Sequence, residues 1–182
     1  MTPKETKSIG IYIAGPYTAR LSDEAKTKEK INANIFQARR VLAEFLRFIH
    51  RTGVKIRPFC PMTHTAHFEE LAPDIPAEVY YKMDIEELKT KDVMVLTPGW
   101  EKSYGCSLEI EECQKHSIPI FIIDDLKKIQ EKIQQIVDFF QKEEFQNFLI
   151  AKLLILKKEY PEKKFWAVDE ILKYGDGGFN IQ

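Results

Sequence analysis

The sequence of 182 residues predicts an α/β fold, a Rossmann- or flavodoxin-like parallel sheet with flanking helices and a helical C-terminal extension. Four short apolar runs are bounded by Gly, Pro or polar residues, which is typical of buried parallel strands. Stretches with helical spacing separate these runs, and such alternation indicates parallel strands joined by right-handed crossovers. Beyond residue 124 only helical spacing remains. We therefore expect an α/β domain over residues 1–124 and a helical extension over residues 125–182.

The first strand, loop and helix follow directly after a short polar N-terminus. Residues 9–14 (Ile-Gly-Ile-Tyr-Ile-Ala) form an apolar run that ends at a Gly-Pro pair, and a loop follows over residues 15–23. Apolar side chains recur at helical spacing over residues 27–51, which predicts a long amphipathic helix. Gly53 is expected to end this helix, because glycine readily adopts the left-handed conformation found there.

The middle of the chain repeats this alternation. A second strand over residues 54–60 leads into a loop over residues 61–76, which we expect to contain little regular structure. A helix over residues 77–90 then precedes a third strand over residues 93–97.

The last helix and strand of the predicted sheet follow a Pro-Gly turn. The helix covers residues 103–116, and the fourth strand covers residues 118–123. Ligands of open parallel sheets bind outside the C-terminal ends of the strands. Three loops lie at those ends and are the candidates to form a site, namely residues 15–23, 61–76 and 98–105.

The C-terminal extension has a helical composition throughout. Residues 126–158 are rich in Lys, Gln, Glu, Ile, Leu and Phe at helical spacing, which predicts two helices. One more helix is expected over residues 164–174. We expect the extension to pack on the sheet domain or on a neighbouring subunit, and a partner-binding arm is the alternative.

The composition is that of an ordinary globular protein and limits the partners. With a net charge of −1, from 27 basic and 28 acidic residues, the chain has no excess positive charge to attract a nucleic acid polymer, so we expect no such partner. No apolar stretch is long enough to cross a bilayer and the N-terminus is unlike a signal peptide, so we expect no membrane partner and a cytoplasmic location. The cysteines lack a Cys-x-x-Cys spacing, and a zinc site from Cys60, His64 and His67 is poorly spaced, so we expect no metal and no cofactor.

Five polar or glycine residues have functional potential, and each also has an ordinary structural explanation. Asp84 and Glu109, each considered alone, would be solvent-exposed helix residues. Asp92 stands between a helix and a strand, where turn residues are common. Ser103 is a natural helix N-cap, and Gly105 allows a close approach of the backbone.

Three stretches of the chain carry these residues in a joint pattern. They are residues 11–16 (Ile-Tyr-Ile-Ala-Gly-Pro), residues 81–88 (Tyr-Lys-Met-Asp-Ile-Glu-Glu-Leu) with Asp92, and residues 98–109 (Pro-Gly-Trp-Glu-Lys-Ser-Tyr-Gly-Cys-Ser-Leu-Glu). This pattern resembles the nucleoside 2-deoxyribosyltransferase superfamily, which includes the 2′-deoxynucleoside 5′-monophosphate N-hydrolases. The resemblance covers about residues 9–123 and is to an uncharacterised branch with the Gly-Trp-Glu-Lys-Ser pattern.

The resemblance implies cleavage of an N-glycosidic bond through a covalent intermediate. Glu109 matches the nucleophile, which attacks the anomeric carbon of the sugar and expels the base. Tyr12 matches a tyrosine whose hydroxyl orients that carboxylate. Asp84 matches the aspartate that hydrogen-bonds or protonates the leaving base, a role that a raised pKa would suit.

Ser103 indicates which substrate the resemblance implies. In the transferases the residue six positions before the nucleophile is acidic and bonds the sugar 5′-hydroxyl, whereas in the monophosphate N-hydrolases a serine there bonds phosphate. A serine at a helix N-terminus, beside Gly105, favours a (deoxy)nucleoside 5′-monophosphate. Pro16 stands where the hydrolases have a second phosphate-binding serine, so Thr18 or Arg20 would have to substitute for it.

The remaining expected contacts come from the loops around this position. His64 is expected to stack on the base, and Trp100 is expected to cover the sugar or to pack its own loop. The full set of expected substrate-binding residues is Ser103, Gly105, Gly15, Tyr17, Thr18, Arg20, Trp100 and His64.

Two other functions remain open at this point. A nucleoside 2-deoxyribosyltransferase would exchange bases between deoxynucleosides through the same intermediate. A non-catalytic nucleotide-binding module would keep the crevice, but the joint presence of Tyr12, Asp84 and Glu109 argues against it. The resemblance also implies a homodimer or higher homo-oligomer, with a small-molecule nucleotide or nucleoside as the partner.

Overall fold

The computed structural model describes residues 8–18 and 28–142, and the chain forms two compact units. The first unit, Met1–Gln135, contains the whole sheet. The second unit, Ile136–Gln182, is described only as far as residue 142, and those residues are helical. The helices predicted beyond residue 142 lie outside the described residues.

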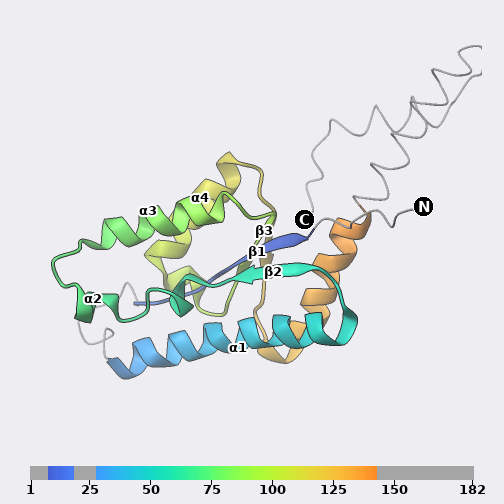
Figure 1. Ribbon diagram of the computed structural model, residues 1–182, viewed down its shortest axis with the longest axis horizontal. Coiled ribbons are helices and arrows are strands. Elements are labelled where there is room, and N and C mark those ends of the chain that lie inside the picture. The colour runs from blue at the N-terminus through green and yellow to red at the C-terminus, as the bar shows by residue number, and fades with distance from the viewer. Residues whose placement is uncertain (1–7, 19–27, 143–182) are drawn as a thin grey trace, which may run out of the picture. The chain divides into compact units, whose positions relative to one another are not determined.

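Four parallel strands form one sheet, which confirms the predicted α/β class (Figure 1). The strand order is β2-β1-β3-β4, with β1 Ile9–Ala14, β2 Ile56–Phe59, β3 Val93–Leu96 and β4 Ile120–Ile122. The two central strands, β1 and β3, are almost entirely buried, as strands covered on both faces must be. In this register Tyr12 of β1 lies beside Phe59 of β2 and Met94 of β3.

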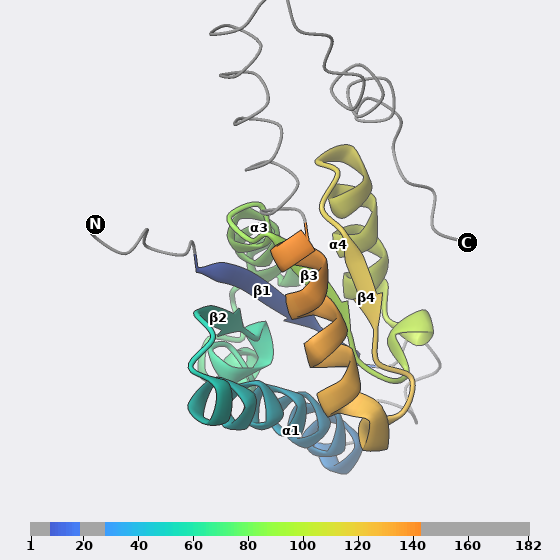
Figure 2. The same cartoon turned by 90° about the vertical axis from the view of Figure 1, so that its right-hand side faces the viewer.

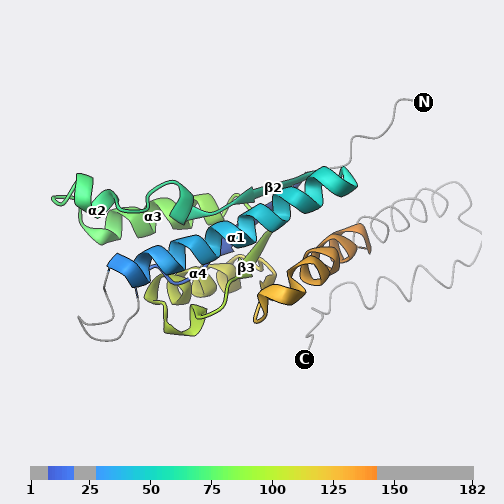
Figure 3. The ribbon, with the colours of Figure 1, turned by 90° about the horizontal axis from the view of Figure 1, so that it is seen from below.

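Helices cover both faces of the sheet. Helix α1, Lys28–Thr52, lies on one side, whereas α3, Ala77–Leu88, and α4, Tyr104–Lys115, lie together on the other (Figure 1, Figure 2). Figure 3 views the sheet from the side of α1. Gly53 ends α1 as predicted, since its φ is +70° and its N–H donates to the Ile49 carbonyl at 2.8 Å.

The loop over residues 61–76 has more regular structure than the sequence predicts. It contains a 3-10 helix, Pro61–Thr63, and a short helix α2, Phe68–Leu71. Helix α2 follows His67, which has a φ of +63° and whose backbone N–H donates to the Tyr17 hydroxyl at 2.9 Å. A contact with the loop after β1 therefore orders this segment, and such a contact leaves no periodic signal in the sequence.

The two edge strands are shorter than predicted. Strand β2 is confined to Ile56–Phe59 and β4 to Ile120–Ile122. Pro58 lies within β2 and Pro119 immediately precedes β4. Because proline has no backbone N–H, Pro119 limits the start of β4, whereas Pro58 pairs with Ile11 inside β2 and is tolerated because β2 is an edge strand.

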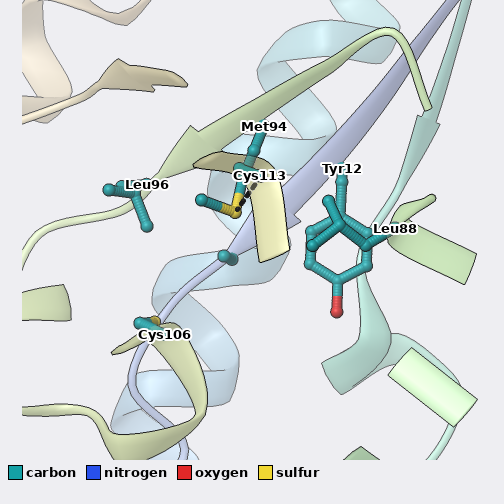
Figure 4. Packing of buried hydrophobic residues seen from close by; sticks show 7 residues of the cluster. Tyr12, Leu88, Met94, Leu96, Cys106 and Cys113 are labelled. Carbon is teal, nitrogen blue, oxygen red and sulfur yellow. Dashed lines mark hydrogen bonds between the residues drawn. The ribbon is translucent and has the colours of Figure 1, made fainter. Parts of the chain in front are cut away.

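A buried cluster joins the sheet to α3 and α4 (Figure 4). Alternate strand residues point to this face, so the cluster contains Tyr12 and Ala14 of β1 with Met94 and Leu96 of β3. The Cys113 thiol of α4 lies 3.7 Å from the Met94 sulfur. This apolar packing fixes the ring of Tyr12, and the position of its hydroxyl is therefore fixed as well.

The first residues of the predicted extension belong to the first unit, which ends at Gln135. Leu126–Lys128 form a 3-10 helix, which the Asp125 side chain caps by accepting a backbone N–H at 2.8 Å. A helix follows from residue 129, and Gln130 Nε2 donates to Glu44 Oε2 of α1 at 2.6 Å. This part of the extension thus packs beside α1. Over the described residues, no helix combines the length and apolar character that crossing a membrane requires.

Candidate active site

The two central strands end where the chain leaves the sheet in opposite directions. After β1 the chain runs to α1 on one face, and after β3 it runs to α4 on the other. Diverging loops at C-terminal strand ends leave a crevice, which is the usual ligand position in open parallel sheets. A cavity of about 280 Å³ lies there, and all three loops predicted from the sequence contribute to its lining. Its volume, at the small end of known ligand sites, suits a ligand of nucleoside size.

Glu109 and Tyr12 form the buried centre of this site. The Tyr12 hydroxyl, at the end of a fully buried side chain, donates to Glu109 Oε1 at 2.6 Å. Glu109 lies in the second turn of α4, lines the cavity and is 8% exposed. Burial raises the pKa of Glu109 to about 7, the Tyr12 hydrogen bond opposes that rise, and the charge of Asp84 adds to it. The predicted orienting contact between Tyr12 and Glu109 is therefore present.

Asp84 faces the same cavity from α3. Its side chain is half-buried, and burial raises its pKa to about 6. Burial also raises the pKa of Tyr12 well above its usual value, and the charges of Glu109 and Asp84 raise it further. Tyr12 therefore remains a hydrogen-bond donor. Asp84 keeps its proton to higher pH than an exposed carboxyl does, and Glu109, which has the higher pKa of the two, keeps its proton to higher pH still.

Ser103 caps the N-terminus of α4 at the edge of the cavity. Its Oγ accepts from the Cys106 N–H at 3.2 Å, which confirms the expected N-cap, and the residue is 6% exposed. Gly105 lies against this cap, since a Cβ there would be 3.8 Å from the Ser103 Oγ and 3.7 Å from the Tyr81 ring. Both residues line the cavity. A serine hydroxyl beside a helix N-terminus favours an anion or a sugar hydroxyl as its ligand.

Tyr17 and Glu69 connect the loop after β1 to α2 at the cavity wall. The Tyr17 hydroxyl donates to Glu69 Oε1 at 2.6 Å and accepts from the His67 N–H at 2.9 Å. Two side chains of α1 brace this connection: Asn34 Nδ2 donates to the Tyr17 carbonyl at 3.0 Å, and Asn32 Oδ1 lies 2.8 Å from His67 Nε2. These hydrogen bonds fix the Glu69 side chain, which is 48% exposed and whose Oε1 also lies 3.9 Å from His67 Nδ1. The residue contributes to the cavity lining.

Gly15 allows close packing at the end of β1. A Cβ at this position would lie 2.1 Å from Thr97 Oγ1 and 3.2 Å from Met62 Cε. Thr97 is 1% exposed, and its hydroxyl is, among the described residues, the buried side-chain polar atom that has no hydrogen-bond partner. A side chain at residue 15 would therefore have to displace Thr97 or the cavity-lining Met62.

Two of the expected substrate contacts do not line the cavity. His64 is exposed and stacks on Phe59 with ring centroids 4.8 Å apart, while Trp100 is partly buried against the core cluster. The stacking of His64 on Phe59 of β2 and the packing of Trp100 against the core cluster give both rings a structural position. Arg20 lies outside the described residues. The cavity is lined by the other residues expected to touch substrate, together with both predicted catalytic carboxyls: Gly15, Tyr17, Thr18, Ser103, Gly105, Asp84 and Glu109.

Asp92 has the structural role that its position between a helix and a strand suggests. It immediately precedes β3, and its Oδ2 accepts from the Gly10 N–H at 2.7 Å. A Cβ at Gly10 would lie 3.2 Å from that oxygen. Because the cavity lies at the C-terminal strand ends, Asp92 is at the opposite end of the sheet.

The cavity also contains residues that sequence reasoning did not select. Glu69, Tyr80, Tyr81 and Tyr104 all contribute to its lining. The spacing of Tyr81 and Asp84, three residues apart on one helix, is a signal that could have placed both on the same face. Glu69 carries no comparable signal, because the contacts of Tyr17 place it.

The arrangement can supply a nucleophile and a proton donor to one ligand. Glu109 has a fixed hydrogen-bond donor on one carboxylate oxygen, and Asp84 lines the same cavity with a raised pKa. Two carboxyl groups beside one cavity are the usual equipment for glycosidic bond cleavage. Within residues 8–18 and 28–142, no three His, Cys, Asp or Glu side chains gather as metal ligands.

The sheet and the cavity lie within a stretch that matches a protein family. A family model described as a domain of unknown function, DUF1937, matches residues 9–125, which is more than half of the chain. No curated protein matches the chain.

Proposed function

The chain belongs to the DUF1937 family, whose function is unknown, and we propose that it is an N-glycosidase. The proposed substrates are (deoxy)nucleoside 5′-monophosphates, and the bond cleaved joins the base to the sugar. The observation that carries the proposal is the 2.6 Å hydrogen bond from Tyr12 to Glu109, with Asp84 on the same cavity. The resemblance to the nucleoside 2-deoxyribosyltransferase superfamily, from which the roles of these residues are taken, also supports it.

In the proposed reaction the Glu109 carboxylate attacks the anomeric carbon and forms a glycosyl ester. The Tyr12 hydroxyl holds one carboxylate oxygen, so that the other is directed at the substrate. Asp84 gives its proton to the leaving base. It then acts as a carboxylate and takes a proton from the water that hydrolyses the ester.

The N-terminus of α4 supports a phosphate on the 5′ side of the sugar. Ser103 presents a hydroxyl where the transferases have a carboxylate, and the dipole of α4 favours negative charge there. Thr18 lines the same cavity and can add a second hydroxyl.

Base exchange between free deoxynucleosides is the second candidate, and the charge of the cavity favours it. Glu69, Asp84 and Glu109 are lining residues, whereas no Lys, Arg or His in the described part of the chain lines the cavity. Carboxylates repel a phosphate dianion and accept hydrogen bonds from a free 5′-hydroxyl. The two candidates thus differ in the 5′ group of the substrate and in the acceptor.

Base release from matched pairs of nucleosides and their 5′-monophosphates, with and without an added acceptor base, tests both candidates. Release from monophosphates without acceptor supports the hydrolase, and exchange among free deoxynucleosides supports the transferase. Glu109→Gln is expected to abolish either activity, because an amide cannot form the ester. Glu111→Gln makes the same change at an exposed position of α4 and is the matched control. Turnover by Glu109→Gln at the wild-type rate would exclude the covalent mechanism.

A further inference from the structure

Among the described residues, the cavity lining has three acidic side chains, which is one more than the proposed reaction requires. A nucleophile and an acid account for Glu109 and Asp84, but not for Glu69, which Tyr17 holds in the lining by a 2.6 Å hydrogen bond. No described residue of the lining is a Lys, Arg or His. Three carboxyl side chains line the cavity of about 280 Å³, and each adds negative potential in its ionised form, which favours a positively charged ligand over a neutral one of the same shape. The Glu69 side chain is 48% exposed, so solvent screens its charge more than that of Glu109.

The uncharged part of the lining is rich in tyrosine. Tyr17, Tyr80, Tyr81 and Tyr104 all line the cavity. Tyr81 and Tyr104 meet edge to face, with ring centroids 5.9 Å apart and an interplanar angle of 78°. Tyrosine rings stack on flat heteroaromatic groups and attract cations through their π faces. Aromatic rings combined with carboxylates form the kind of surface that recognises an organic cation.

We propose that the site takes N-glycosides whose base is a cationic heteroaromatic ring, such as an N-ribosyl pyridinium, with the carboxylates of Glu69 and Asp84 and the tyrosines facing the positive charge. This inference rests on the proposed function, because it names a substrate class for the same Glu109 nucleophile. It concerns the base and holds with or without a 5′-phosphate.

Such a substrate changes what Asp84 has to do. The bond from the anomeric carbon to the ring nitrogen breaks, its electron pair neutralises the pyridinium, and the base leaves without needing a proton. A bond forms between the carbon and a Glu109 oxygen. Water then attacks the carbon, the electron pair of the ester bond returns to Glu109, and the water proton passes to the Asp84 carboxylate and on to solvent. Asp84 therefore acts only as a general base, in the second step, and never as the acid that protonates the leaving base.

Binding of two small probes to the full-length wild-type protein tests the charge preference. 1-Methylnicotinamide is a permanent cation, and nicotinamide is a neutral molecule of nearly the same shape. By titration calorimetry, the cation is expected to bind at least about tenfold more tightly than the neutral probe. Glu69→Gln is expected to reduce that ratio by at least about threefold, and the exposed control Glu111→Gln to leave it unchanged. Equal affinities for the two probes in the wild-type protein would overturn the inference.

Turnover separates this inference from the proposed function. Release of nicotinamide from nicotinamide riboside or its 5′-phosphate, abolished in Glu109→Gln, supports the inference. Glu109-dependent release of neutral bases, with none from the pyridinium substrates, overturns the inference and leaves the proposed function standing. If no N-glycoside of either kind is cleaved, the proposed function fails, and the substrate claim fails with it even where the cation binds.

Discussion

The Tyr12 hydroxyl and the Glu109 carboxylate, 97 positions apart in the chain, are joined by a 2.6 Å hydrogen bond beneath the cavity. The ring of Tyr12 is fixed by the packing of β1 against β3 and the helices, so the bond holds Glu109 in one orientation. It also opposes the rise in the pKa of Glu109 that burial causes. One contact therefore sets both the direction and the ionisation of the proposed nucleophile.

Replacement of Tyr12 by Phe tests both effects. Loss of the donor is expected to lower the rate of base release by roughly 10- to 100-fold, because the carboxylate is no longer oriented. The pKa of Glu109 should rise further above 7, since the opposing hydrogen bond is gone. The acidic limb of the pH–rate profile should therefore move to higher pH. An unshifted limb would mean that the bond does not govern the ionisation of Glu109.

Replacement of Asp84 by Asn is expected to shift the same limb in the opposite direction. The charge of Asp84 contributes to the raised pKa of Glu109, so its removal should lower that pKa and move the limb to lower pH. Release of a neutral base should fall by roughly 10²- to 10⁴-fold, because Asn cannot donate a proton. The pH–rate profiles of Asp84→Asn and Tyr12→Phe, measured on one substrate, provide the comparison, and shifts in the same direction would contradict the assignment.

The buried charge of Glu109 makes stability depend on pH. Its pKa is raised in the folded state from 4.5 to about 7, so its favourable contribution is complete below 4.5 and is lost as the pH rises through 7. Gln removes this dependence. Relative to wild type, Glu109→Gln should therefore gain up to about 3 kcal/mol in unfolding free energy between pH 4 and pH 8.

Urea unfolding of both proteins at pH 4 and pH 8 measures this gain. The exposed Glu111→Gln variant provides the reference for the same amide substitution on α4. A constant difference between Glu109→Gln and wild type across that range would show that the carboxylate is not held in a desolvated site.

Replacement of Ser103 by Asp separates the capping role of Ser103 from its proposed phosphate contact. Asp is as good an N-cap as Ser, so the cap should be kept, whereas Ser103→Ala should lose about 1 kcal/mol. Because residue 103 is 6% exposed, the new carboxylate also carries a desolvation cost, which falls as the pH is lowered. The Asp carboxylate adds another negative charge to the cavity and should strongly reduce turnover of monophosphates while sparing free nucleosides. The ratio of kcat/KM for a nucleoside and its monophosphate measures this effect, and an unchanged ratio would remove Ser103 from the substrate site.

Replacement of Gly15 by Ala should destabilise the protein through one defined clash. The new Cβ would lie 2.1 Å from Thr97 Oγ1, and relieving such overpacking costs about 1–3 kcal/mol. Thr97→Ala should recover most of that loss, because the clashing atom has no hydrogen-bond partner among the described residues to forfeit. A double-mutant cycle in urea checks this coupling, and additive effects would contradict the close packing.

Local patterns in the sequence were sufficient for the elements that frame the site. The apolar runs predict the central strands β1 and β3, Gly53 ends α1, and Ser103 caps α4. Each of these signals acts over a few neighbouring residues, through helical periodicity, burial or capping, and can be recognised without knowledge of the fold. The order of strands and helices then places three loops at one edge of the sheet.

Tertiary structure alone decided which side chains meet in the cavity. The order β2-β1-β3-β4 brings Tyr12 to Glu109, and the contact of Tyr17 with His67 places α2 and the Glu69 carboxylate. By the same route His64 packs on a strand residue instead of lining the cavity. The physical reason is that these contacts join residues far apart in the chain, and their geometry depends on strand register and packing. The raised pKa values of Glu109 and Asp84 follow from the same burial, which depends on the packing of the fold and cannot be recognised in the sequence.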